Sequence, residues 1–174
     1  SWSQLGTDID GEAAGDRSGI AVSISADGDT VAIGAHENDG NGTDAGHVRI
    51  YRLETGSWLK IGPDIDGEAS GDESGYSVSL SSDGKFVAIG ARQNDGNGTD
   101  AGHVRIFNLG PSSWSQFGGD MGGEAAGDWF GYKVSLSSDG RTFAAGVPFG
   151  NGSKGTVGVY SIDKDHDGVA DPQD

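Results

Sequence analysis

The sequence contains no cysteine, four prolines and a single methionine among its 174 residues. Without cysteine, disulfide bonds and thiolate metal sites are excluded. No apolar run approaches the ~18 residues that a membrane-spanning helix needs, so we expect no insertion into a membrane. Because the one methionine, Met121, is internal, a chain that begins at Ser1 is expected to be a processed product or an excised piece.

Positive charge is scarce as well. The chain has 11 Lys and Arg against 27 Asp and Glu, a formal net charge of −16. So acidic a surface repels phosphate backbones, which excludes nucleic acid as a partner. Hydrophobic residues make up only 33%, but 33 glycines supply further non-polar residues. The composition therefore indicates a folded chain built from small residues rather than a disordered one.

Internal repetition is the most prominent feature of the sequence. Trp2, Trp58 and Trp114 are spaced 56 residues apart, and the text around them recurs as SWSQLGTDIDGEAAGD, SWLKIGPDIDGEASGD and SWSQFGGDMGGEAAGD. Repetition at such a period is typical of arrays of one supersecondary unit. The prediction is a three-unit array over residues 1–162, with units 1–56, 57–112 and 113–162, and an acidic tail at 163–174.

The sequence of each unit predicts four short strands, labelled A to D in the order in which they pair. In strand A of the second unit, residues 76–81, apolar and serine side chains alternate, and an Asp-Gly pair typical of a hairpin turn follows. Strand B is illustrated by residues 87–91, strand C by 47–51 and strand D by 57–62. The expected fold class is all-β: three tandem four-stranded antiparallel meanders, or propeller-like blades, in the order D-ABC-D-ABC-D-ABC.

Two short motifs accompany these strands. Phe130-Gly131 precedes strand A of the third unit, and Gly146-Val147-Pro148 follows its strand B. With these motifs the units resemble FG-GAP repeats, the blades of the integrin α-subunit propeller, in the form common in microbial surface proteins. The resemblance implies a propeller fold and an extracellular or cell-surface location. The family's calcium loop lies between strands A and B, where this chain has only a tight Asp-Gly turn, so that site is not carried over.

The C-terminal tail reads D-x-D-x-D-G-x-x-D-x-x-D and resembles a thrombospondin type-3 calcium loop. Carboxylates at alternate positions surround a hard cation, and a glycine permits the sharp turn between them. The alternative is a solvated acidic tail. The predicted calcium ligands are Asp163, Asp165, Asp167, the Val169 carbonyl, Asp171 and Asp174.

Weaker calcium candidates lie in the acidic loops that precede strand A. Asp side chains that cap tight turns explain the same pattern, and we favour that interpretation. In the third unit the loop keeps Asp120, Glu124 and Asp128 but has Gly122 in place of an aspartate. The candidates in the first two units are Asp8, Asp10, Glu12, Asp16, Asp64, Asp66, Glu68 and Asp72.

Asn41, Asn97 and Asn151 each begin an Asn-Gly-Thr or Asn-Gly-Ser triplet in the loop between strands B and C. The triplet fits the N-glycosylation pattern, although Asn-Gly is also favoured in turns. No nucleophile–base pair or phosphate-binding loop is recognisable, and His47 and His103 are interpreted as structural strand residues. The prediction is that the chain is not an enzyme.

Two functions remain after these exclusions. The first is an extracellular structural protein that assembles with itself; the second is an adhesion or ligand-binding module, excised from a larger propeller, that binds glycans or cell-surface proteins. The third unit lacks a strand D, whereas the chain opens with one at residues 1–6. Three blades are below the ~4–8 of closed propellers. We therefore expect the N-terminal strand of one chain to complete the third blade of another, in a filament or a six-bladed dimer, with calcium as the stabilising ion.

Overall fold

A computed structural model describes residues 1–161 of the chain. Antiparallel strands account for all its regular structure except one short helix, and none of its helices is long and apolar enough to cross a membrane. In chain order the elements are β1 Ala21–Ile24, β2 Thr30–Ala35, β3 His47–Glu54, β4 Ser57–Lys60, β5 Ile65–Asp66, β6 Ser74–Leu80, β7 Phe86–Ala91, β8 His103–Leu109, β9 Trp114–Gln116, β10 Met121–Gly122, β11 Lys133–Leu136, β12 Thr142–Val147, α1 Gly150–Ser153 and β13 Thr156–Ser161.

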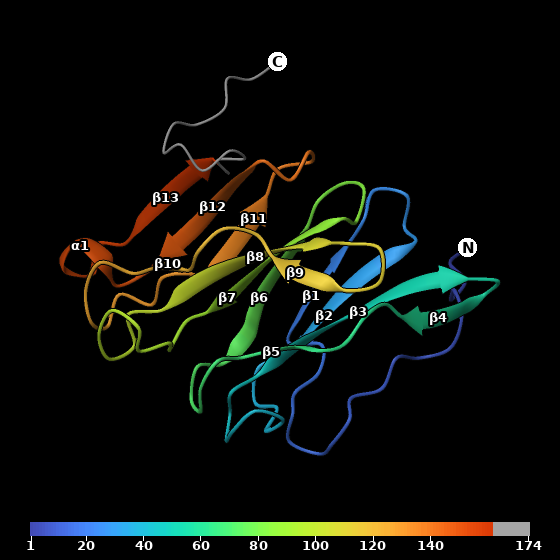
Figure 1. Ribbon diagram of the computed structural model, residues 1–174, viewed down its shortest axis with the longest axis horizontal. Coiled ribbons are helices and arrows are strands. Elements are labelled where there is room, and N and C mark those ends of the chain that lie inside the picture. Colours follow the sequence, from blue (N-terminus) through green and yellow to red (C-terminus); the bar gives the residue numbers. More distant parts are fainter. Residues whose placement is uncertain (162–174) are drawn as a thin grey trace.

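The strands form three sheets that follow one another along the chain (Figure 1). The first sheet has the order β1-β2-β3-β4, and β5 also pairs with β3. The second repeats this pattern with β6, β7, β8, β9 and β10, whereas the third, within residues 1–161, contains β11, β12 and β13. The predicted fold class, antiparallel meanders arranged as propeller-like blades, is confirmed.

Hairpin turns between the first two strands of each blade follow from the Asp-Gly pairs. In the first blade the Asp27 carboxylate accepts hydrogen bonds from Ser25 Oγ at 2.6 Å and from the Asp29 amide at 3.0 Å. Gly28 adopts a φ of 79°, a conformation that glycine takes without steric cost. Asp83 and Asp139 accept the same pair of bonds in the other two blades.

The hydrophobic core lies between adjacent blades. One cluster joins Val48 and Ile50 of the first blade to Val78 and Leu80 of the second, and another joins the second blade to the third. Hydrogen bonds cross both boundaries in the same way: the Leu80 amide donates to Ser23 Oγ and the Leu136 amide to Ser79 Oγ, each at 2.9 Å. Each blade therefore docks onto the next through a repeated set of contacts.

The first predicted strand does not form, whereas the short elements β5, β10 and α1 were not predicted. Residues 1–6 form no strand, and the N-terminal trace runs beside β4 (Figure 1). Its equivalents β4 and β9 pair with β3 and β8, the third strands of the preceding blades. A strand requires a pairing partner, and no other segment of residues 1–161 pairs with residues 1–6.

Candidate functional site

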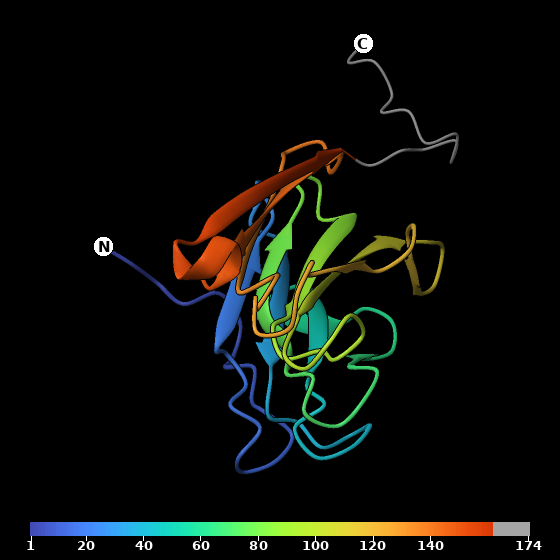
Figure 2. The ribbon, with the colours of Figure 1, turned by 90° about the vertical axis from the view of Figure 1, so that its left-hand side faces the viewer.

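The two ends of the array expose surfaces that the interior blades bury. On the third blade Val157 and Val159 are 66% and 69% exposed, whereas Val48 and Val104, the equivalents of Val157, are 0% and 1% exposed. We call Val157, Val159 and the neighbouring Gly146 the rear face. Strand β13, which carries both valines, forms the outer edge of the third sheet (Figure 2).

The first blade exposes the complementary surface. Ile20, Val22 and Ile24 are exposed and are called here the front face; their second-blade equivalents include Val78 and Leu80, which are buried against the first blade. The front and rear faces are therefore the two halves of the contact that joins the blades inside the chain.

The preceding N-terminal segment is exposed too. Trp2 is fully exposed and Leu5 largely so. The Leu5 carbonyl accepts a hydrogen bond from Trp58 Nε1 at 2.9 Å, as the Ile61 carbonyl does from Trp114 Nε1 at 3.0 Å. Residues 1–6 thus already contact the first blade as residues 57–62 contact the second, but their own strand-pairing edge is unused within the described residues.

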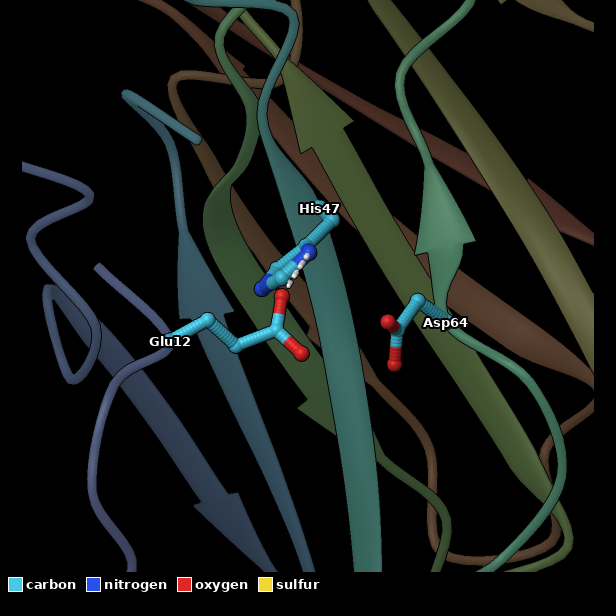
Figure 3. A group of neighbouring side chains, drawn as sticks. All are labelled: Glu12, His47 and Asp64. Atoms are coloured by element: carbon cyan, nitrogen blue, oxygen red, sulfur yellow. Dashed lines mark ion pairs between the residues drawn. The ribbon is translucent and has the colours of Figure 1, made fainter. Parts of the chain in front are cut away.

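A second candidate site lies at the start of β3 in the first blade, where Glu12, His47 and Asp64 meet (Figure 3). One ligand atom from each side chain lies within 4.8 Å of the others. His47 begins β3, and Glu12 and Asp64 belong to the segments that enter the first and second blades. The same arrangement recurs one unit later as Glu68, His103 and Asp120.

Both imidazoles are almost fully buried and neutral. His47 Nδ1 faces Glu12 Oε2 at 3.9 Å, too far for a hydrogen bond, and His47 Nε2 has no partner among the described residues. Burial lowers the pKa of His47, and burial together with the Arg105 charge lowers the pKa of His103 to about 4. Desolvation thus outweighs the attraction of the nearby carboxylates, and each imidazole keeps a free nitrogen lone pair.

Charged neighbours distinguish the two clusters. In the first, Lys60 Nζ lies 2.8 Å from Asp64 Oδ1, whereas in the second the neutral Gln116 amide donates to Asp120 Oδ1 at 2.7 Å. An arginine lies close to the glutamate in both clusters, Arg49 at 3.5 Å and Arg105 at 3.6 Å. A cavity of about 220 Å³, lined in part by Glu68, His103 and Asp120, opens at the second cluster.

The third unit lacks the cluster. Thr156 stands where the first two units have histidine, and Gly158 where they have arginine. A cavity of about 600 Å³ lies at this position, lined in part by Thr156, Gly158, Glu124 and Asp128 and bordered by Phe130 and Tyr160.

The other acidic residues predicted as calcium ligands are spread over the loops. Asp16 and Asp72 are buried and cap turns: each accepts from a backbone amide, of Ala13 or Ala69, and from a buried asparagine side chain. Asp8 accepts from Gln4, and the Asp10 and Asp66 backbone carbonyls accept from Arg49 and Arg105. The predicted C-terminal loop, Asp163 to Asp174, lies outside the described residues.

The three candidate glycosylation sites are exposed, but two of the asparagines have structural contacts. Asn41 Nδ2 donates to the Gly67 carbonyl at 2.8 Å and Asn97 Nδ2 to the Gly123 carbonyl at 3.1 Å, across a blade boundary in each case. Asn151 lies in the shortened third loop with a φ of 52°. Glycosylation stays a prediction.

Sequence reasoning interpreted His47 and His103 as structural and missed their carboxylate neighbours. The available signal was the 56-residue period. Glu12, His47 and Asp64 recur 56 residues later as Glu68, His103 and Asp120, whereas the third unit has Thr156 at the position of the histidine. Residues that come from one blade and two distant loops leave no local motif.

The fold and these sites define a partial β-propeller built from repeated blades. The FG-GAP repeat profile matches residues 7–51 and 65–107, which together are half of the chain. The chain belongs to the FG-GAP repeat family. Comparison with curated protein sequences finds no match.

Solved structures with the same fold are distant in sequence. The Pseudomonas aeruginosa periplasmic gluconolactonase is similar with a TM-score of 0.56 and 18% identity, over 81% of this chain and 38% of that one. A putative 6-phosphogluconolactonase from Bacteroides uniformis is similar with a TM-score of 0.55 and 15% identity, over 80% of this chain and 35% of that one. Hydrazine synthase of Kuenenia stuttgartiensis is similar with a TM-score of 0.54 and 15% identity, over 82% of this chain and 33% of that one. The chain thus spans between 33% and 38% of the length of these proteins.

These structures correct the prediction that the chain is not an enzyme. Proteins named as lactonases and as a synthase share the fold, although identities of 15% to 18% show the fold alone. The exclusion of enzymes was wrong because it rested on the absence of linear motifs, and the fold is one that enzymes share. In a bladed fold, side chains distant in sequence converge, as Glu12, His47 and Asp64 do.

Proposed function

We propose that this chain is an extracellular propeller module that assembles with itself, the N-terminal segment of one copy completing the third blade of the next. The observation that carries the proposal is the exposure of Val157 and Val159 at positions that the first two blades bury. A second copy presents the matching front face and an unpaired strand segment in one continuous stretch. Docking it would bury both apolar surfaces and pair the edge of β13.

The register of the added strand follows from the interior blades. Tyr51 pairs with Lys60 and Val48 with Ile65, so Tyr160 would pair with the next copy's Gln4 and Val157 with its Ile9. Lys133 pairs with Gly146 beside the rear face and is bulkier than Ala21 and Ser77, which the first two blades have at this position. Its ammonium group lies 5.3 Å from the centre of the Tyr76 ring, which places its charged end among aromatic side chains.

Repeated docking of this kind is head-to-tail, and we favour a filament over a two-fold exchange that would give a six-bladed dimer. Calcium in the C-terminal acidic loop is proposed to stabilise the assembled module, and the family resemblance supports an extracellular or cell-surface location.

The test is the size of the assembly in solution, measured by light scattering over a range of concentrations. Deleting residues 1–6 removes the donated strand. Gly146→Ala places a methyl group on the rear face, where the equivalent Gly34 approaches the Gly75 backbone; within one chain its nearest neighbour would be Lys133 O at 3.6 Å. Both variants are expected to be monomeric. Gly119→Ala, with nothing within 4 Å, is the control that still assembles.

Assembly that persists unchanged without residues 1–6 would refute the donated strand. A wild-type chain that stays monomeric at every concentration would favour the second candidate, an adhesion or ligand-binding piece of a longer propeller. That candidate is supported by the coverage, since the chain spans no more than 38% of the similar structures. Its rear face would then be covered by a fourth blade of the same polypeptide.

A further inference from the structure

We propose that the Glu12–His47–Asp64 and Glu68–His103–Asp120 clusters are two binding sites for a divalent transition-metal ion of the zinc class. Each cluster offers one imidazole nitrogen and two carboxylate oxygens from three separate segments. This inference is independent of self-assembly, because both sites are complete within one chain.

The buried histidines are the first support. His47 and His103 are enclosed at the start of β3 and β8. In both, the nitrogen that faces the glutamate is Nδ1, and it lies 3.9 Å from Glu12 Oε2 or 3.7 Å from Glu68 Oε2, too far for a hydrogen bond. A buried polar atom without a close partner costs free energy, and coordination of a metal by Nδ1 would give it one in both copies.

The spacing of the ligand atoms is the second support. The three atoms lie within 4.8 Å of one another. Tetrahedral zinc with bonds of ~2.0–2.2 Å holds its ligands roughly 3.4 Å apart, so a shift of about 1 Å suffices. The Glu12 and Glu68 side chains are 44% and 42% exposed and are free to make this adjustment. A fourth position remains for water.

The donor set decides the class of ion. Calcium and magnesium prefer oxygen ligands alone, whereas a mixed set of imidazole and carboxylate suits zinc and its first-row neighbours. The arginine beside each glutamate compensates part of the negative charge. In the second cluster two carboxylates and one guanidinium leave a net charge near −1, whereas in the first Lys60 brings the sum near zero.

The two sites are expected to differ in affinity. Lys60 competes with a metal for Asp64 in the first site, whereas Gln116, at the equivalent position, leaves the Asp120 charge uncompensated. The cavity of about 220 Å³ at the second cluster gives a metal and its water room to enter. The site of Glu68, His103 and Asp120 therefore binds more tightly.

The experiment is a calorimetric titration of zinc into the metal-free full chain, with excess calcium present to occupy any oxygen-only site. Two zinc ions of unequal affinity are expected to bind. His103→Thr should remove the tighter site and His47→Thr the weaker; threonine is the residue that the third unit carries there, as Thr156. Lys60→Gln should tighten the first site about tenfold, because it removes one competing charge.

Cobalt(II) absorption gives a second readout, since four-coordinate nitrogen and oxygen ligation produces a visible band that the double threonine variant would lose. Melting curves in chelator check that the variants are folded. Zinc binding that is undiminished in the double variant, or no zinc binding to the wild-type chain at millimolar concentration, would overturn the proposal.

Discussion

The three repeated tryptophans occupy equivalent positions and differ in burial. Trp114 is 8% exposed in the core between the first two blades, Trp58 is half-buried, and Trp2 is fully exposed. Sequence alone makes them equal; only the presence or absence of a neighbouring blade distinguishes them.

Trp114→Ala is expected to lower the free energy of unfolding by about 3–5 kcal/mol, the usual cost of removing a large buried side chain. Trp2→Ala should change it by less than about 0.5 kcal/mol in the monomer, because an exposed side chain loses no packing. Urea denaturation at low protein concentration measures both. Equal losses in the two variants would contradict the burial.

His36 links stability to pH. It is buried beside Tyr76, with ring centres 5.3 Å apart, and burial lowers its pKa below the ordinary 6.5 despite the carboxylates of Glu37 and Glu73; Arg92 and Arg17 lower it further. At pH values between the folded and the unfolded pKa, the unfolded chain therefore binds a proton at His36 that the folded chain does not bind. The stability that the neutral imidazole contributes is fully present above pH 6.5 and is lost as the pH falls below it.

His36→Gln is expected to make stability less sensitive to acid between pH 6.5 and pH 5, because the variant has no proton to take up at this position. Melting temperatures of the wild type and the variant over this range check the effect; the remaining histidines titrate in both proteins and cancel. Parallel curves would show that His36 is not responsible.

At the scale of elements, glycine sets how closely the blades approach. A Cβ on Gly34 would overlap the Gly75 carbonyl oxygen, and one on Gly90 would overlap that of Gly131. Backbone contact at these two points explains why a chain with 33% hydrophobic residues still forms a core. The small residues replace side-chain volume with close strand packing.

Gly34→Ala and Gly90→Ala are each expected to destabilise the chain by at least about 1–3 kcal/mol, because the backbone across the blade boundary has to move. Gly146→Ala, the third-blade equivalent, should leave the unfolding free energy of the monomer nearly unchanged. Denaturation of the three variants tests the contrast, and a comparable loss in Gly146→Ala would contradict it.

For the whole molecule, the net charge of −16 makes cations a source of stability, since like charges repel in the compact state. Calcium is expected to raise the melting temperature by several degrees and a chelator to lower it, by mass action on the native state. Asp165→Asn with Asp167→Asn should remove the calcium effect and leave any zinc effect intact. Identical curves of the wild type with calcium and with chelator would exclude a stabilising calcium site.

The array and its strands were predictable because their signals are local. The 56-residue period, the alternation from Tyr76 to Leu80 and the Asp-Gly turns each depend on residues near in sequence. The strand predicted at residues 1–6 does not form for a non-local reason, because a strand needs a partner and no other segment of the described residues pairs with this one.

What the sequence determined by itself was therefore the repeating unit, its strand pattern and its acidic, small-residue composition. The tertiary structure decided which faces are buried, and that His47 and His103 each meet two carboxylates. The physical reason is range. Strand and turn formation, including the turns that Asp16 and Asp72 cap, depends on neighbouring residues. Burial depends on one blade packing against the next, and each histidine meets carboxylates from two loops that are distant from it in sequence.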